Sequence, residues 1–438
     1  MVTQKGLGQS RFCYAKPLPI PTKRLQPRAY HAFRCIGADC EDTCCSGWLV
    51  NVDKDTYELY QRCGDAEMGP RLRELVNINP VSQSSNSFAR IGLDGASCPF
   101  LDHGLCSVQN RLGDTYLSIT CAKYPRVWNV VDDVVQRSLD LACPEAARLM
   151  LLDPGPMAFD EDDGADLRPG ELCELTTRDP GSAKPYAFFR EIRAFLIELL
   201  QYRAYPLWKR LVVLGSFCDQ LEQLAEAGQN AQVPAAIQWF RQAVAGNQLD
   251  AAIQQHSPKP VLQLGIVLEL IVARITAEYV APRFLECYRE FKDGILWTAQ
   301  SSMEEIGRRY AAAYARDFAP FLERHGHLLE HYLVNYAHRT LFPLGPQKGI
   351  GDPHIDHKVE TIRDHCLLML VYYGVIQTVL IGQAAFHRAN FSPANAIPAV
   401  QSVTKAFEHN LSFSGQALKI LPEKGIRNCV SMAILLRN

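Results

Sequence analysis

The sequence has no strong excess of charge of either sign. Its 438 residues include 45 lysines and arginines against 47 aspartates and glutamates, which gives a formal net charge of -2 at pH 7. A nearly neutral chain has no overall field that would draw it to a polyanion. We therefore expect neither nucleic acid nor an anionic membrane as its partner.

The sequence also lacks a long apolar run near its amino terminus. Residues 1–27 mix lysine, arginine and proline, without the hydrophobic stretch that a secretory signal requires. The most apolar window, residues 367–381, contains Gln377 and is shorter than the roughly 20 residues that span a bilayer. We therefore expect a cytoplasmic protein in which this window forms a buried helix.

Cysteine, by contrast, is abundant, with 15 in the chain. The cytosol keeps thiols reduced, so these cysteines are not expected to form a disulfide framework. Ten of them lie within the first 143 residues. The other five are scattered singly, at Cys173, Cys218, Cys287, Cys366 and Cys429. We interpret these five as ordinary buried thiols.

Eight of the amino-terminal cysteines have the spacing of metal ligands. They follow the pattern Cys35-x4-Cys40-x3-Cys44-Cys45, then Cys98-x7-Cys106, then Cys121 and Cys143. Thiolates are soft, anionic ligands that suit zinc or the iron of iron-sulfur clusters. Eight thiols exceed the four that one zinc ion uses, and the paired C-x2-C pattern of a zinc ribbon is missing. The pattern favours an iron-sulfur cluster of the four-iron type, with a zinc site or a reduced cysteine core as alternatives.

The rest of the sequence indicates a mostly helical protein with a few short strands. Near-alternation from Trp48 to Val52 predicts a strand, and valine-rich segments around Asp132 and Asp133 predict a hairpin that brings Cys121 and Cys143 together. Residues 153–180 are rich in proline, glycine and acidic residues, which indicates a linker with a solvated acidic loop at residues 160–163. Beyond residue 185 long helical periods begin.

These patterns divide the chain into four parts. We predict a flexible lead at 1–27, a cysteine-rich iron-sulfur or zinc domain at 28–152, a linker at 153–185 and an all-helical domain at 186–438. On one predicted helix, His327 and His331 lie one turn apart and form a weaker candidate for a metal site. The competing interpretation of that pair is a solvated polar face.

The cysteine strings resemble those of a known family. The strings are Phe33-Arg34-Cys35-Ile36-Gly37, residues 40–48, Cys98-Pro99-Phe100-Leu101-Asp102 with Gly104-Leu105-Cys106, residues 117–126, and Leu141-Ala142-Cys143-Pro144-Glu145. They are similar to those of the flagellin lysine-N-methylases, within the wider group of proteins that have zinc- or iron-chelating cysteine domains. A weaker similarity continues at residues 332–336, 341–343 and 406–409. Where that family has an acidic residue followed by asparagine, this chain has Glu330 followed by His331.

This resemblance implies a function that the residue patterns alone do not reach. It implies an enzyme that contains an iron-sulfur cluster and transfers a methyl group from S-adenosylmethionine to lysine side chains of flagellin. The sequence contains neither a G-x-G-x-x-G between a strand and a helix nor the C-x3-C-x2-C signature of radical S-adenosylmethionine enzymes. A non-enzymatic iron-sulfur or zinc module for redox sensing or protein interaction therefore stays open. The sequence assigns no catalytic or S-adenosylmethionine-binding residue.

Overall fold

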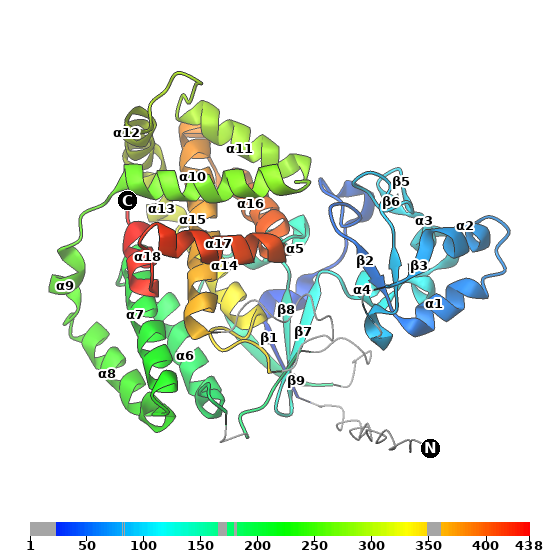
Figure 1. The fold of residues 1–438 in the computed structure, drawn as a ribbon, viewed down its shortest axis with the longest axis horizontal. Coiled ribbons are helices and arrows are strands. Elements are labelled where there is room, and N and C mark those ends of the chain that lie inside the picture. The colour runs from blue at the N-terminus through cyan, green and yellow to red at the C-terminus, as the bar shows by residue number, and fades with distance from the viewer. Residues whose placement is uncertain (1–22, 81, 83, 165–172, 179–181, 348–360) are drawn as a thin grey trace, which may run out of the picture.

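The chain folds into a small lobe and a larger, helical body (Figure 1). The computed structural model describes residues 23–80, 82, 84–164, 173–178, 182–347 and 361–438. Within these residues helices predominate over short strands, as the sequence predicts. The division into four domains stays a prediction, and residues 1–22 of the predicted lead lie outside the described residues.

The small lobe carries most of the cysteine pattern. Its helices are α1 (Lys54–Gln61), α2 (Met68–Leu75), α3 (Ser107–Leu112) and α4 (Ile119–Lys123). Its antiparallel sheet has the order β2-β4-β3, formed by β2 (Val50–Val52), β3 (Val76–Ile78) and β4 (Ala89–Ile91), and β5 (Leu101–Asp102) pairs with β6 (Leu105–Cys106). The predicted strand at β2 is confirmed. The lobe has a hydrophobic core of its own, which includes Tyr60, Leu72 and Phe100.

A five-stranded sheet joins the small lobe to the helices. Its order is β10-β7-β8-β1-β9, with β1 (Lys23–Pro27), β7 (Arg126–Val131), β8 (Val134–Leu139), β9 (Phe159–Asp163) and β10 (Cys173–Leu175). The strands β7 and β8 form the predicted hairpin, and Asp132 takes the positive φ of 56° that its turn needs. Short polar side chains tolerate this left-handed conformation better than most residues.

The prediction of a solvated acidic loop is wrong. The run at residues 160–163 forms most of β9 and pairs with β1. Arg24 and Gln26, from the predicted flexible lead, donate to Asp162, and Arg28 donates to Asp160, so the two arginines neutralise part of the run. These partners are about 135 positions away along the chain, which no local pattern can indicate.

The remaining elements are helices. They are α5 (Pro144–Leu151), α6 (Phe189–Leu200), α7 (Leu207–Glu226), α8 (Val233–Ala245), α9 (Asp250–Gln254), α10 (Pro260–Ala277), α11 (Pro282–Gly294), α12 (Met303–Ala313), α13 (Ala319–His325), α14 (His327–Arg339), α15 (Ile362–His387), α16 (Pro393–Val403), α17 (Leu411–Glu423) and α18 (Cys429–Leu435). Two π-helical turns, Tyr314–Phe318 and Thr404–Glu408, interrupt this pattern. Turns of this kind are rare and often mark functional sites.

Helix α15 runs through the centre of the helical body (Figure 1). Both α10 and α15 are long and apolar enough to cross a membrane by length and composition, but the apolar window of α15 is completely buried inside the protein. The core helix of a globular protein meets the same criteria. The predicted buried helix at residues 367–381 is therefore confirmed.

Close contact between α11 and α15 depends on a glycine. A Cβ atom added at Gly382 would lie 2.6 Å from both Cα and the carbonyl oxygen of Phe291, where no real Cβ atom fits. Gly382→Ala should therefore force the helices apart and lower the free energy of unfolding by about 1–3 kcal/mol, as overpacked cores do. Urea denaturation measures this change. The matched control is Gly64→Ala, because nothing lies within 4 Å of a Cβ at Gly64; equal losses in both variants would contradict the explanation.

Candidate functional site

The interactions between the eight predicted ligand cysteines link them into two groups. The first group, which we call the lobe thiols, lies on the core of the small lobe and comprises Cys44, Cys45, Cys98, Cys106 and Cys121. The second group, the junction thiols, lies where the lobe meets the helical body and comprises Cys35, Cys40 and Cys143. Which of the eight would surround one metal centre stays a prediction.

The lobe thiols are held together by backbone contacts between distant segments. The Sγ atoms of Cys44 and Cys45 are 3.9 Å apart, and the amide of Cys98 donates to the carbonyl of Cys45 at 2.7 Å. Burial raises the pKa of Cys121 to about 12, and the nearby thiols of Cys106, Cys44 and Cys98 add to the increase. Neighbouring thiols whose pKa values are raised in the absence of a metal are typical of a site where a bound cation would stabilise the thiolates.

The junction thiols form a smaller cluster at the start of α5. Burial raises the pKa of Cys143 to about 12, and the thiols of Cys40 and Cys35 raise it further. The nearest thiol neighbours of Cys121 are Cys106, Cys44 and Cys98, and those of Cys143 are Cys40 and Cys35. The approach of Cys121 to Cys143 stays a prediction. Among the residues that the structure describes, no three His, Cys, Asp or Glu side chains converge closely enough to hold a metal ion. Which cysteines bind metal stays a prediction.

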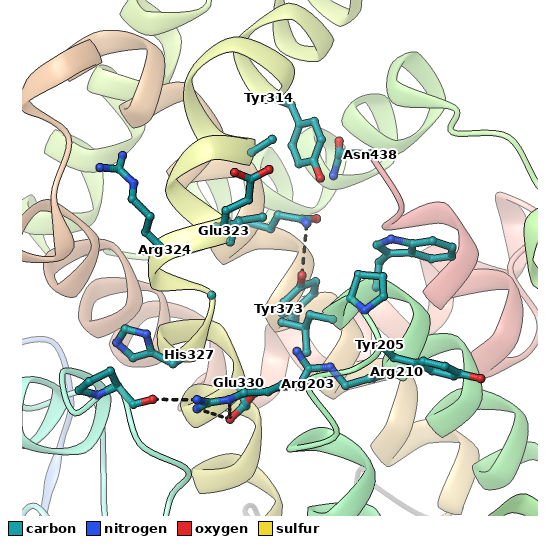
Figure 2. A pocket seen from close by; sticks show the side chains of 18 residues that line it. Arg203, Tyr205, Arg210, Tyr314, Glu323, Arg324, His327, Glu330, Tyr373 and Asn438 are labelled. Atoms are coloured by element: carbon teal, nitrogen blue, oxygen red, sulfur yellow. Dashed lines mark hydrogen bonds and ion pairs between the residues drawn. The ribbon is translucent and has the colours of Figure 1, made fainter. Parts of the chain in front are cut away.

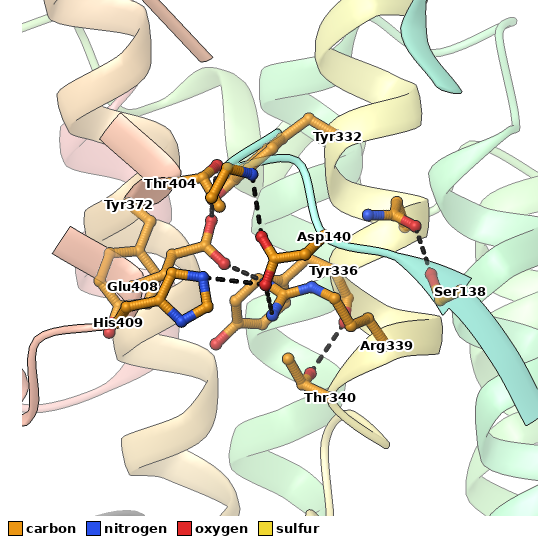
Figure 3. Close-up of polar contacts among 12 residues, drawn as sticks. Ser138, Asp140, Tyr332, Tyr336, Arg339, Thr340, Tyr372, Thr404, Glu408 and His409 are labelled. Carbon is orange, nitrogen blue, oxygen red and sulfur yellow. Dashed lines mark hydrogen bonds and ion pairs between the residues drawn. The ribbon is translucent and has the colours of Figure 1, made fainter. Parts of the chain in front are cut away.

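A buried network of charges surrounds Asp140 (Figure 3), whose carbonyl accepts a hydrogen bond from the amide of Cys143 at 3.3 Å. Its centre is Arg339 at the end of α14, which pairs with Glu408 and, at 3.6 Å, with Asp140. The side chains of the three residues are 11%, 3% and 6% exposed. Buried charges persist only when they are paired and hydrogen-bonded, so each carboxylate depends on the arginine.

Further hydrogen bonds fix Glu408 in the network. The hydroxyl of Tyr332 donates to Glu408 at 2.7 Å, and that of Thr404 donates at 3.3 Å. Glu408 ends one of the two π-helical turns. Burial and the adjacent Glu408 carboxylate both raise the pKa of Tyr332 well above its ordinary value, so this phenol stays protonated and keeps the proton that it donates to Glu408.

At the other end of the network, His409 pairs with Asp140 at 2.9 Å. Burial alone would lower the pKa of His409, but the carboxylate of Asp140 outweighs burial and raises that pKa above 6.5. Burial opposes ionisation of Asp140 too, yet His409 and Arg339 hold its pKa well below the usual range. The pair is therefore fully ionised under mildly acidic conditions.

This ion pair predicts a pH dependence of stability. A histidine whose pKa is raised by folding contributes stability below its unfolded pKa of 6.5 and loses it as the pH rises through the folded pKa. His409→Gln should therefore lower the melting temperature at about pH 6 and have less effect at about pH 9. The control is His103→Gln, because the side chain of His103 is 96% exposed. A loss that is independent of pH would show that His409 acts through packing alone.

The network is assembled from segments that are far apart in the sequence. The hydroxyl of Ser138 donates to Asn335 at 2.6 Å, and the amide of Asn335 donates to the carbonyl of Leu139 at 3.1 Å, which docks α14 on β8. The family strings at residues 332–336, 406–409 and 141–145 therefore meet around Asp140. These three segments are far apart in the sequence and lie together in the fold.

Side chains of α16 and of the π-helical turn Thr404–Glu408 bind the segment that carries Cys40 and Cys44. We call these contacts the clamp. The ammonium of Lys405 donates to Asp42 at 2.9 Å and to the carbonyl of Thr43 at 2.8 Å. The amide of Gln401 bonds both Asp42 and the carbonyl of Ala142 at 2.8 Å. Sequence reasoning missed Asp42 and Lys405, because they pair over a separation of 363 positions. The clamp ties the cysteine turn to the helical body.

A second candidate region is a cavity of about 600 Å³ in the helical body (Figure 2). It lies between α7, α13, α14 and α15, and it includes the carboxyl-terminal residue, Asn438. At one end Glu330, which is 1% exposed, accepts hydrogen bonds at 2.8 Å from both Arg203 and Arg210. Glu330 is the acidic residue of the family pattern. No local pattern in the sequence indicates the cavity, because residues from four separate helices form it.

The predicted histidine pair lies at the edge of this cavity. The rings of His327 and His331 are 5.8 Å apart, but Nε2 of His331 bonds the carbonyl of Gly155 at 2.8 Å. Burial lowers the pKa of both imidazoles, which favours their neutral forms. Neither histidine belongs to a cluster of three ligand-type side chains among the described residues.

Three of the cysteines that look scattered in the sequence also meet. Cys218 on α7, Cys366 on α15 and Cys429 on α18 are 0% exposed, and the thiol of Cys366 is hydrogen-bonded to both others. Burial raises the pKa of Cys366 well above its ordinary value, and the other two thiols reinforce the effect. The prediction of buried thiols is confirmed for these residues, but their contact with one another was not foreseen.

Comparison with known proteins finds one family model and several relatives that match the chain. Residues 193–435 match the family model described as the FliB lysine N-methylase C-terminal domain. The flagellar biosynthetic protein FliU of Salmonella muenchen is 37% identical over 139 residues, which are 31% of this chain and 81% of that protein.

Two further relatives are named lysine-N-methylase. Those of Salmonella typhimurium and Salmonella choleraesuis are each 34% identical over 139 residues. The match spans 34% of the length of each of these two proteins. No solved structure matches the chain.

Proposed function

The chain belongs to the FliB lysine N-methylase family, and on that premise we propose that it transfers methyl groups from S-adenosylmethionine to lysine side chains of flagellin. The observation that carries the proposal is the match over residues 193–435, which is more than half of the chain. The names of the relatives, lysine-N-methylase and flagellar biosynthetic protein, support the reaction and the flagellar substrate.

We further propose that the cysteines hold an iron-sulfur cluster. The chemistry of the donors fits such a group, since five lobe thiols supply more than the four ligands that a four-iron cluster uses. When bound, a cluster of this kind supplies one-electron redox chemistry or a rigid cross-link between chain segments. The clamp between Lys405 and Asp42 would then join the cluster-bearing turn to the helical body. We place the reaction in the cytoplasm, where thiols stay reduced.

The reaction requires a lysine amine without its proton. The nitrogen forms a bond to the methyl carbon while the carbon-sulfur bond breaks, so S-adenosylhomocysteine leaves and the excess proton passes to water. Desolvation by apolar and aromatic side chains lowers the pKa of an amine and so favours its neutral form. Among the described residues, the cavity in the helical body combines such walls, at Tyr314 and Tyr373, with enough volume to receive a small molecule.

The second candidate function is a redox or interaction module without catalysis. It is favoured by the exposed thiol of Cys35, since reactive cysteines of sensors are accessible to solvent. A module of this type would neither consume S-adenosylmethionine nor depend on flagellin lysines.

The two functions differ in whether S-adenosylhomocysteine is formed. We expect the protein, purified without oxygen, to release S-adenosylhomocysteine when both S-adenosylmethionine and flagellin are present, over many turnovers. Flagellin whose lysines have been acetylated is the matched control, and it should give no product. Equal product with native and acetylated flagellin would exclude lysine as the acceptor, and its absence in both would favour the binding module.

A further inference from the structure

The cavity between α7, α13, α14 and α15 has two chemically different ends (Figure 2). At the lower end in this view, two guanidinium groups, of Arg203 and Arg210, face the single carboxylate of Glu330. One positive charge is thus in excess there. In addition, Nε of Arg210 is buried and has no hydrogen-bond partner among the described residues. This end suits a carboxylate.

The other end of the cavity carries a carboxylate, that of Glu323, next to the guanidinium of Arg324. Glu323 lines it with an exposed carboxylate, which has no ion-pair partner within the described parts of the chain. The Oδ1 atom of Asn438 is buried there without a hydrogen-bond partner among the same residues. A carboxylate and an amide oxygen accept hydrogen bonds from hydroxyl or amino groups, such as those of a ribose or a purine.

Aromatic rings line the space between the two ends. Trp208, Tyr314 and Tyr373 contribute to the wall. The guanidinium of Arg437 covers one face of the Trp208 ring, 4.2 Å from its centroid, which leaves the other face for a ligand. Burial raises the pKa of both Tyr314 and Tyr373, so their rings stay neutral. Neutral aromatic faces stack on planar bases and attract cations. The π-helical turn Tyr314–Phe318 supplies one of these rings.

We propose that this cavity is the binding site for S-adenosylmethionine, with the carboxylate of its amino-acid part toward the two arginines and its nucleoside toward Glu323. The inference rests on the proposed function, which requires this methyl donor. An amino-acid carboxylate, a cationic sulfonium and a nucleoside follow one another along that molecule, in the order in which the cavity offers cationic, aromatic and hydrogen-bond-accepting groups. The volume of about 600 Å³ lies within the range of small-molecule sites.

A second pocket that contains a tryptophan fits the methyl donor less well. It has a volume of about 330 Å³ and is lined by Trp128 and Tyr30 together with three cationic side chains, Lys123, Arg126 and Arg137. No acidic residue lines it. Three positive charges would repel a sulfonium, so this pocket serves as the comparison in the test.

Calorimetric titration with S-adenosylhomocysteine, which is stable and lacks the reactive methyl group, tests the site without relying on activity. We expect Trp208→Ala to weaken binding about tenfold, because a stacking ring is lost, and Trp208→Phe to recover most of the affinity. Glu323→Gln should weaken binding about tenfold as well, since a charged acceptor becomes neutral. The controls are Trp128→Ala in the other pocket and Glu304→Gln on the surface, which should bind like the original protein.

The outcomes separate this inference from the proposed function. If the cavity variants bind S-adenosylhomocysteine unchanged while the original protein methylates flagellin, the donor site lies elsewhere and only this inference is overturned. A selective loss in Trp128→Ala would also overturn it and point to the other pocket. If the original protein binds neither S-adenosylhomocysteine nor S-adenosylmethionine, with or without flagellin, both the inference and the proposed function are wrong.

Discussion

Arg339→Met is expected to lower the free energy of unfolding by about 3–5 kcal/mol, the typical cost of removing one partner of a buried ion pair. Arg339 is the common partner of Asp140 and Glu408, both of which are nearly completely buried. Without the guanidinium, the two carboxylates would stay buried with less compensation and would repel each other. Methionine keeps much of the volume, so the change reports on charge rather than on a cavity.

Urea denaturation measures this loss, and Arg62→Met provides the matched control. Arg62 is 74% exposed and pairs with Glu58, which is 51% exposed, and surface pairs of this kind contribute only about 0–1 kcal/mol. A double variant, Arg339→Met with Glu408→Gln, should recover part of the stability, because one of the two stranded charges is removed. Equal losses in the buried and surface variants would contradict the role assigned to the network.

The second large effect is expected at the lobe thiols. Replacing Cys98 or Cys121 by serine should abolish metal binding or reduce it to a small fraction, since a hydroxyl is a poor ligand for iron or zinc. Cys98 is buried and Cys121 is half-buried, and both lie beside other lobe thiols, so no outside ligand can easily take their place. Iron, zinc and acid-labile sulfide, measured on protein prepared without oxygen, report the result and distinguish a cluster from a zinc ion.

The matched control for these variants is Cys63→Ala in the same lobe. Cys63 is 5% exposed and belongs to the lobe core, but it is not one of the lobe thiols. Cys35→Ser and Cys143→Ser then test the junction thiols separately. If Cys98→Ser and Cys121→Ser keep their full metal content, the lobe thiols are not the ligands; if only the junction variants lose metal, the site belongs to that group.

Local patterns predicted those parts of the fold that depend on neighbouring residues. The hairpin of β7 and β8 follows from valine-rich segments around Asp132, and the buried α15 follows from its long apolar run. In the same way, the spacing of the cysteines identified thiols that the fold brings into two groups. A helix or hairpin is decided within about 20 residues, so its signal is contained in that window.

Long-range pairing explains what the sequence could not predict. The acidic run of β9 looks like a solvated loop until Arg24 and Arg28 are placed beside it. Likewise Lys405 and Asp42, or Arg339 and Asp140, are unremarkable charged residues in the sequence and become partners only in the folded chain. The division of the cysteines into two groups is a property of the same kind, because it depends on how the lobe docks against the helices.

The mass of flagellin after incubation with the purified protein and S-adenosylmethionine, in the absence of oxygen, tests the central claim most directly. Our account predicts mass increments of whole methyl groups that map to lysine side chains and require both the methyl donor and the metal-loaded protein. Flagellin of unchanged mass, obtained with protein that retains its full metal content and binds S-adenosylmethionine, would contradict it.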